Sequence, residues 1–136
     1  MIGPRVADLR GWAAGLSVGL VVVATACSGG GADTFTPKSA SAVRGWALAT
    51  DRGCASCHSV NGEEMTGPSW KGLWGSKVVL ESGQTVTVDR RYLVTALREP
   101  NEQRPKGAVN QMPTYGPDRV SEAQIDDLVA VLKELR

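Results

Sequence analysis

The stretch Cys54-Ala55-Ser56-Cys57-His58 places two thiols three positions apart and sets the single histidine of the chain directly beside the second thiol. The only other cysteine is Cys27. A close thiol pair beside an imidazole is compatible with three kinds of site: a redox-active disulfide, a metal site, or a covalent attachment site for haem. The rest of the sequence distinguishes between these three.

Length and charge limit the class of protein before any motif is interpreted. The 136 residues suffice for one domain with a modest core. The formal net charge is +1 and no run of lysine or arginine occurs, so we expect no nucleic-acid partner. Residues 71–106 hold seven basic side chains against four acidic ones. This local excess is compatible with an acidic partner and equally with an ordinary solvated surface.

The first 27 residues have the organisation of an export signal. Two arginines precede residues 11–26, an uncharged stretch shorter than the roughly 20 apolar residues of a typical membrane span. The stretch ends in small residues followed by Cys27, which resembles the lipobox of bacterial lipoproteins, although Ala24 stands where a leucine is usual. This resemblance implies cleavage before Cys27 and acylation of its thiol. The alternative is an ordinary signal peptide or an uncleaved anchor in which Cys27 has no role.

Residues 28–40 are rich in glycine and small polar side chains, a composition typical of a flexible tether. We therefore expect three parts: a signal peptide over 1–27, a tether over 28–40 and one folded domain over 41–136. The protein would be exported and lipid-anchored, on the outer face of the cytoplasmic membrane or in the periplasm.

Elimination selects one reading of the thiol pair. A structural zinc ion needs four ligands, and Cys54, Cys57 and His58 provide three, with no second cluster downstream. A redox-active pair needs a thioredoxin-like strand–helix–strand context, which the sequence does not show. The pattern C-x-x-C-H is instead the signature of c-type haem attachment. The sequence thus predicts one haem c, bound to Cys54 and Cys57 through thioethers, with His58 as an axial ligand of the iron.

The second axial ligand must be another residue type, because the chain has one histidine. Met1 is lost with the signal peptide, and Met65 follows His58 by only seven positions. Met112 remains, 54 positions after His58, in a Met-Pro dipeptide within an expected loop. Methionine also commonly fills gaps in a core. The loop position nevertheless favours Met112 as the sixth ligand.

From about residue 41 to the C-terminus, the chain resembles a single-haem class I cytochrome c. The resemblance rests on Gly45-x-x-Leu48 before the haem motif, on Thr66-Gly67-Pro68 and Lys71-Gly72-Leu73-Trp74-Gly75 after it, and on Tyr92-Leu93, Ala96-Leu97 and Pro100. The last group is particularly similar to cytochrome c domains associated with respiratory terminal oxidases. In this family the proline carbonyl accepts a hydrogen bond from the axial histidine, a role that falls to Pro68.

The resemblance implies an all-α cytochrome c fold wrapped around one covalently bound haem. It implies a one-electron carrier of a respiratory or related membrane-associated chain, without enzymatic activity. The expected partners are redox proteins such as a quinol:cytochrome c oxidoreductase or a terminal oxidase, and the membrane through the lipid. Since a porphyrin needs flat apolar walls, we expect Trp70 and Trp74 in the haem pocket.

Two other functions remain open. If Met112 is absent from the iron or labile, the haem is a gas-binding or peroxidase-like site. If the domain is a fixed subunit of a respiratory complex, the tether serves assembly more than diffusion.

Local patterns predict the other elements. Ser121 and Gln124 form a capping box before a C-terminal helix. Asp89 is placed to cap a helix that Pro100 ends. Residues 78–80 and 85–88 flank Ser82-Gly83, a signal for a small β-hairpin insertion. The C-terminal helix carries an apolar stripe made by Ile125, Leu128, Val129, Leu132 and Leu135.

The crossing of the first and last helices departs from the family pattern. Members of the family usually pack two aromatic residues there, and the corresponding positions are Ala49 and Val131. Trp46 is the candidate to fill the space from a neighbouring position.

Overall fold

The computed structural model describes residues 35–109 and 112–136. The chain divides into Met1–Gly30 and Gly31–Arg136, and the described fold belongs entirely to the second unit. The predicted signal peptide, Cys27 and the first part of the predicted tether therefore lie outside the described residues. Within the described ranges, no helix has both the length and the apolar character needed to cross a membrane.

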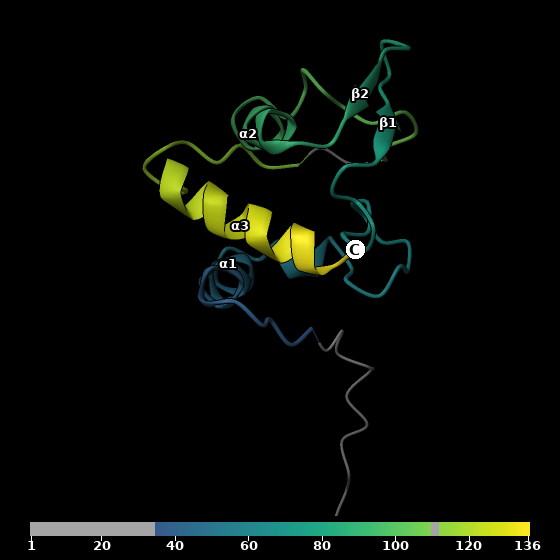
Figure 1. The fold of residues 1–136 in the computed structure, drawn as a ribbon. Helices are drawn as coiled ribbons and strands as arrows, with labels where there is room; N and C mark the ends of the chain where they lie inside the picture. Colours follow the sequence, from purple (N-terminus) through teal and green to yellow (C-terminus); the bar gives the residue numbers. More distant parts are fainter. Residues whose placement is uncertain (1–34, 110–111) are drawn as a thin grey trace, which may run out of the picture. The chain divides into compact units, whose positions relative to one another are not determined.

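Three α-helices and a two-stranded antiparallel sheet form the domain (Figure 1). The expected helical fold with a small hairpin is thus observed. The elements are α1 (Ala40–Asp51), a short 3-10 helix (Cys54–Ser56), β1 (Lys77–Val79), β2 (Thr85–Thr87), α2 (Arg90–Arg98) and α3 (Glu122–Glu134).

The first and last helices, α1 and α3, cross in close contact (Figure 1). The crossing depends on Gly45, which is buried: a Cβ atom at this position would overlap the backbone oxygen of Asp127 and lie 2.9 Å from Val131 Cγ2. Glycine thus allows the two backbones to approach. Beside the crossing, the Arg44 guanidinium pairs with the Asp127 carboxylate at 2.7 Å.

Small residues and one tryptophan complete this crossing. Ala49 and Val131 are both fully buried, as expected for paired small positions. Trp46 packs against both buried clusters of the core. Its ring contacts Phe35 edge to face, with centroids 5.4 Å apart, and Trp70 in the same manner at 6.4 Å.

The predicted helix caps are confirmed. The Ser121 side chain accepts from the backbone N–H of Gln124, and the Gln124 side chain accepts from the N–H of Ser121, which closes the capping box of α3. Asp89 caps α2 by accepting from the N–H of Tyr92. The α3 helix ends at Glu134 and α2 at Arg98, two residues before Pro100.

The predicted hairpin is also confirmed. Lys77 pairs with Thr87, and Val79 with Thr85, around a turn in which Gly83 has a φ of 84°. The hairpin also binds the segment that follows α2, because the N–H of Glu81 donates to the Arg104 carbonyl at 3.0 Å and the N–H of Lys106 donates to the Val79 carbonyl at 2.8 Å. This segment leads towards the Met112 loop.

Residues 35–39, which the composition assigned to the tether, are packed on the domain. Phe35 contacts Trp46, and the backbone N–H groups of Lys38 and Ser39 donate to the Glu134 carboxylate at 2.7 and 2.9 Å. Helix α1 then begins at Ala40. The folded domain therefore starts earlier than position 41, because an aromatic side chain and a helix N-terminus here find partners in the core and on α3.

Candidate functional site

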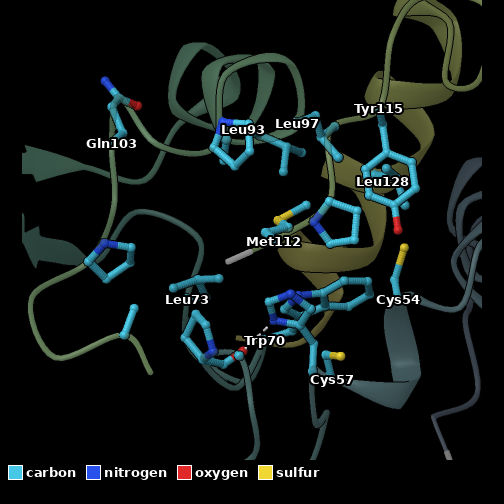
Figure 2. A pocket seen from close by; sticks show the side chains of 18 of the residues that line it. Cys54, Cys57, Trp70, Leu73, Leu93, Leu97, Gln103, Met112, Tyr115 and Leu128 are labelled. Atoms are coloured by element: carbon cyan, nitrogen blue, oxygen red, sulfur yellow. Dashed lines mark hydrogen bonds between the residues drawn. The ribbon is translucent and has the colours of Figure 1, made fainter. Parts of the chain in front are cut away.

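The described domain contains a cavity of about 370 Å³, and Figure 2 shows side chains that line it. Its walls are mostly apolar and come from the thiol motif, the loop that follows it, α2, the Met112 loop and α3. Six of the residues predicted for the haem site meet there: Cys54, Cys57, His58, Pro68, Trp70 and Met112.

The two thiols lie on one turn at the border of the cavity. Cys54 begins the 3-10 helix and Cys57 is its C-cap, with the N–H of Cys57 donating to the Cys54 carbonyl at 3.1 Å. Neither thiol is in a disulfide, and burial raises the pKa of the Cys54 thiol. Figure 2 shows Cys54 beside Tyr115 and Cys57 below Trp70. Two thiols held on one turn suit two thioether bonds to one porphyrin.

The imidazole of His58 is fixed by its hydrogen bond to Pro68. Its Nδ1 atom lies 2.8 Å from the carbonyl oxygen of Pro68. A carbonyl oxygen only accepts, so Nδ1 carries the proton and Nε2 keeps a free lone pair. Burial lowers the pKa of His58, and the smaller effect of the Pro68 hydrogen bond raises it. The site therefore favours the neutral imidazole, which is the form able to ligate a metal ion.

Gly67 and Trp70 enclose the same ring on two sides. A Cβ on Gly67 would lie 2.5 Å from Cε1 and 2.7 Å from Nδ1 of His58, so only glycine allows this approach. The Gly67 N–H donates to the Cys57 carbonyl at 2.8 Å, which ties this loop to the thiol motif. The Trp70 ring stacks on the imidazole with centroids 5.5 Å apart and an interplanar angle of 27°.

Met112 lines the cavity from a different part of the chain. It is half-buried and packs against the core cluster that contains Leu97 and Tyr115 (Figure 2). Met65, in contrast, is 43% exposed and is not among the residues of the cavity wall. Of the two methionines within the described ranges, only Met112 shares a cavity with His58.

The two tryptophans differ in position. Trp70 lines the cavity as predicted, whereas Trp74 does not, and its neighbour Leu73 lines the wall instead. The Lys133 ammonium lies 5.2 Å from the centre of the Trp74 ring, a cation–π distance. Trp74 therefore contacts the last turn of α3 through Lys133.

Other wall residues were not singled out from the sequence. Tyr115 is buried, and its hydroxyl donates to the Arg52 carbonyl at 3.3 Å, which connects the Met112 loop to the thiol motif. Gln103 and Arg104 join the wall from the segment held by the hairpin. Tyr92, Leu93, Ala96 and Leu97 of α2, which carry part of the family resemblance, line the cavity as well.

The donor atoms match the requirements of a c-type haem. Two thiols occupy one border, a neutral imidazole nitrogen and a thioether sulfur share the cavity, and the remaining wall is largely apolar. Within residues 35–109 and 112–136, no cluster of three or more histidine, cysteine, aspartate or glutamate side chains is arranged to hold a metal ion. The two thiols, the imidazole and the apolar walls together fit a covalently attached haem.

Comparison with known protein families identifies the family of this domain. A family model described as cytochrome c matches residues 42–136, which is most of the chain and all three helices except the first two residues of α1. No curated protein matches the sequence. The chain belongs to the cytochrome c family, whose members transfer electrons through haem, and it binds haem c covalently, with Cys54 and Cys57 at the positions of attachment.

Proposed function

We propose that this cytochrome c is a one-electron carrier whose haem iron is ligated by His58 and Met112. The observation that supports this ligation most directly is that both side chains line one cavity, although they lie 54 positions apart in the sequence. The His58 tautomer supports it further, because the hydrogen bond to Pro68 leaves Nε2 as the ligating nitrogen. A thioether opposite an imidazole stabilises ferrous iron and raises the reduction potential.

The haem supplies the exchange of one electron, and the residues of the chain bind and tune it. The apolar walls keep water from the iron, and the Pro68 carbonyl orients the imidazole and increases its basicity. If His58 and Met112 both ligate the iron, no coordination position would be left for a substrate. The geometry therefore favours transfer of electrons over chemistry at the iron.

Carbon monoxide tests the ligation and the function together. We expect the ferrous protein, without denaturant, to bind carbon monoxide poorly at neutral pH, because Met112 occupies the sixth position. Fast and complete formation of a carbon monoxide adduct would reject the carrier and support the gas-binding or peroxidase-like alternative. Unfolded holoprotein, in which methionine is displaced, provides the positive control.

We propose in addition that the domain is exported and held at a membrane surface through an acylated Cys27. The basic and uncharged segments before Cys27 support this, and so does the glycine-rich stretch that follows Cys27 in the sequence. Mass spectrometry of the mature N-terminus should find a diacylglycerol-modified Cys27. In Cys27→Ser we expect uncleaved precursor or soluble protein, and an unmodified N-terminus at another residue would contradict the anchor.

The proposed partners are respiratory redox proteins, such as a quinol:cytochrome c oxidoreductase or a terminal oxidase. The similarity of residues 92–100 to oxidase-associated domains supports this. The basic excess over 71–106 supports it less, because three of those seven basic groups, Arg90, Arg98 and Arg104, form ion pairs within the domain. A free carrier should be released as a single component by gentle detergent extraction, whereas a fixed subunit should be extracted together with an oxidase.

A further inference from the structure

The loop that carries Met112 is held by contacts to Tyr115, three residues further along the chain. The N–H of Tyr115 donates to the Leu97 carbonyl at 2.8 Å, and its hydroxyl donates to the Arg52 carbonyl at 3.3 Å. The side chain is buried, with 6% of its surface exposed. Whatever fixes the Tyr115 backbone therefore also limits the path of Met112 and Pro113.

Arg98 binds the backbone carbonyl of Tyr115. Its Nη1 donates to the Tyr115 carbonyl at 2.6 Å, a short charge-assisted hydrogen bond. Its Nη2 donates to the Glu122 carboxylate at 3.1 Å. The Arg98 side chain is only 15% exposed. One guanidinium, on the last residue of α2, thus connects that helix, the Met112 loop and the first turn of α3.

We propose that Arg98 is a positioning residue for Met112. By holding the Tyr115 carbonyl at the end of α2, it limits the path of residues 112–115 and keeps the Met112 sulfur at the cavity. Without Arg98, residues 112–115 would be held less firmly and an exogenous ligand would replace the sulfur more easily. This inference rests on the proposed ligation of the iron by Met112.

Arg90 provides a matched control within the same group of ion pairs. It also binds Glu122, at 2.9 Å, and additionally Asp126, at 2.6 Å. It lies at the first position of α2 and does not line the cavity. Replacing Arg90 therefore removes an ion pair between α2 and α3 and leaves the hydrogen bond to Tyr115 in place. Comparison of the two variants therefore separates the loss of stability caused by a missing ion pair from the effect of Arg98 on residues 112–115.

The test is a titration of the ferric holoprotein with imidazole, which competes with Met112 for the iron. We expect Arg98→Met to bind imidazole roughly tenfold more tightly than the wild type, because the charge-assisted hydrogen bond that holds the Tyr115 carbonyl is lost. The far-red charge-transfer band of the sulfur–iron bond should disappear at correspondingly lower imidazole concentration. Arg90→Met should bind imidazole as the wild type does. The imidazole affinity of Arg98→Lys should lie between those of the wild type and Arg98→Met. A lysine ammonium cannot replace the planar guanidinium, which donates to the Tyr115 carbonyl and the Glu122 carboxylate at once.

The possible failures are distinguishable. Equal imidazole affinities of Arg98→Met and Arg90→Met, in proteins that both show the sulfur band, would overturn the positioning role and leave the ligation intact. A wild-type protein without the band would overturn the ligation itself, and with it the inference. If Arg98→Met yields no folded holoprotein, Arg98→Lys against Arg90→Lys decides by the same measurement: equal affinities reject the role, and a tighter complex of Arg98→Lys supports it.

Discussion

The carbonyl oxygen of Pro68 lies 2.8 Å from Nδ1 of His58, and this contact connects the haem motif to the loop that follows it. The contact fixes the tautomer of the imidazole and leaves Nε2 free to bind iron. The preceding residue, Gly67, lies so near the ring that a side chain there would displace it. The loop therefore orients the histidine by a hydrogen bond and by steric contact.

We expect Gly67→Ala to alter the haem site itself. Its Cβ would come within 2.5 Å of the imidazole, so the ring must move and the hydrogen bond to Pro68 must weaken. The reduction potential and the Soret spectrum should change, and the yield of holoprotein should fall. In Gly72→Ala, where φ is +70° and no atom lies within 4 Å of the added Cβ, we expect only a loss of roughly 1–2 kcal/mol of stability. Wild-type spectra and potential in both variants would show that Gly67 does not constrain the histidine.

Gly45→Ala tests the crossing of α1 and α3. Alanine in place of glycine usually stabilises a helix by about 0.5–1 kcal/mol. At Gly45 we expect the opposite sign, with a loss of roughly 1–3 kcal/mol from overpacking against the Asp127 backbone. Urea denaturation of the holoprotein measures the difference. Val43→Ala, on the exposed face of the same helix, should change stability by no more than about 0.5 kcal/mol. A stabilised Gly45→Ala would show that the helices are not in close contact at this point.

The ion pairs of Glu122 predict part of the acid sensitivity of the fold. Hydrogen bonds from Arg90 and Arg98 hold the pKa of Glu122 below its ordinary value of 4.5. A carboxylate with a lowered pKa in the folded state stabilises the fold above its unfolded pKa, and this contribution is lost as the pH falls through the folded value. Glu122→Gln should therefore be less stable than the wild type at pH 7, and the difference should shrink below about pH 4.5. A difference that is independent of pH would assign the effect to packing.

Single cysteine substitutions test the attachment of the haem. We expect Cys54→Ala and Cys57→Ala each to retain one thioether or to yield unstable holoprotein, and the double variant to lose haem on denaturing electrophoresis. The apoprotein should fold poorly, because the cavity would then lack the group that fills it. Ser56→Ala, which changes a side chain between the two thiols, should keep its haem. Haem that remains with the denatured double variant would refute the proposed linkage.

Local signals in the sequence predicted much of the fold. The capping box at Ser121, the Asp89 cap and the turn at Gly83 each depend on residues near one another in the chain. The roles of Cys54, Cys57 and His58 could also be predicted from the sequence, because the attachment motif is contiguous. Such features need no knowledge of tertiary contacts.

Features that depend on contacts between distant segments were harder to predict. Phe35 follows a glycine-rich stretch, and only its contact with Trp46 shows that it belongs to the domain. Trp74 and Leu73 are neighbours in an irregular loop, so the sequence could not show which of the two faces the cavity. The role of Arg98 also remained hidden, because its partners Tyr115 and Glu122 lie 17 and 24 positions away.

The central claim, that Met112 is the sixth ligand of the iron, is tested most directly by Met112→Ala with Met65→Ala as control. A thioether is a soft neutral ligand that favours ferrous iron, so its loss should lower the reduction potential, abolish the far-red band of the ferric protein and admit carbon monoxide. Met65 is exposed and outside the cavity wall, so Met65→Ala should match the wild type in all three measurements. An unchanged band and potential in Met112→Ala would contradict the account and assign the sixth position to another side chain, with Lys106 as the next candidate.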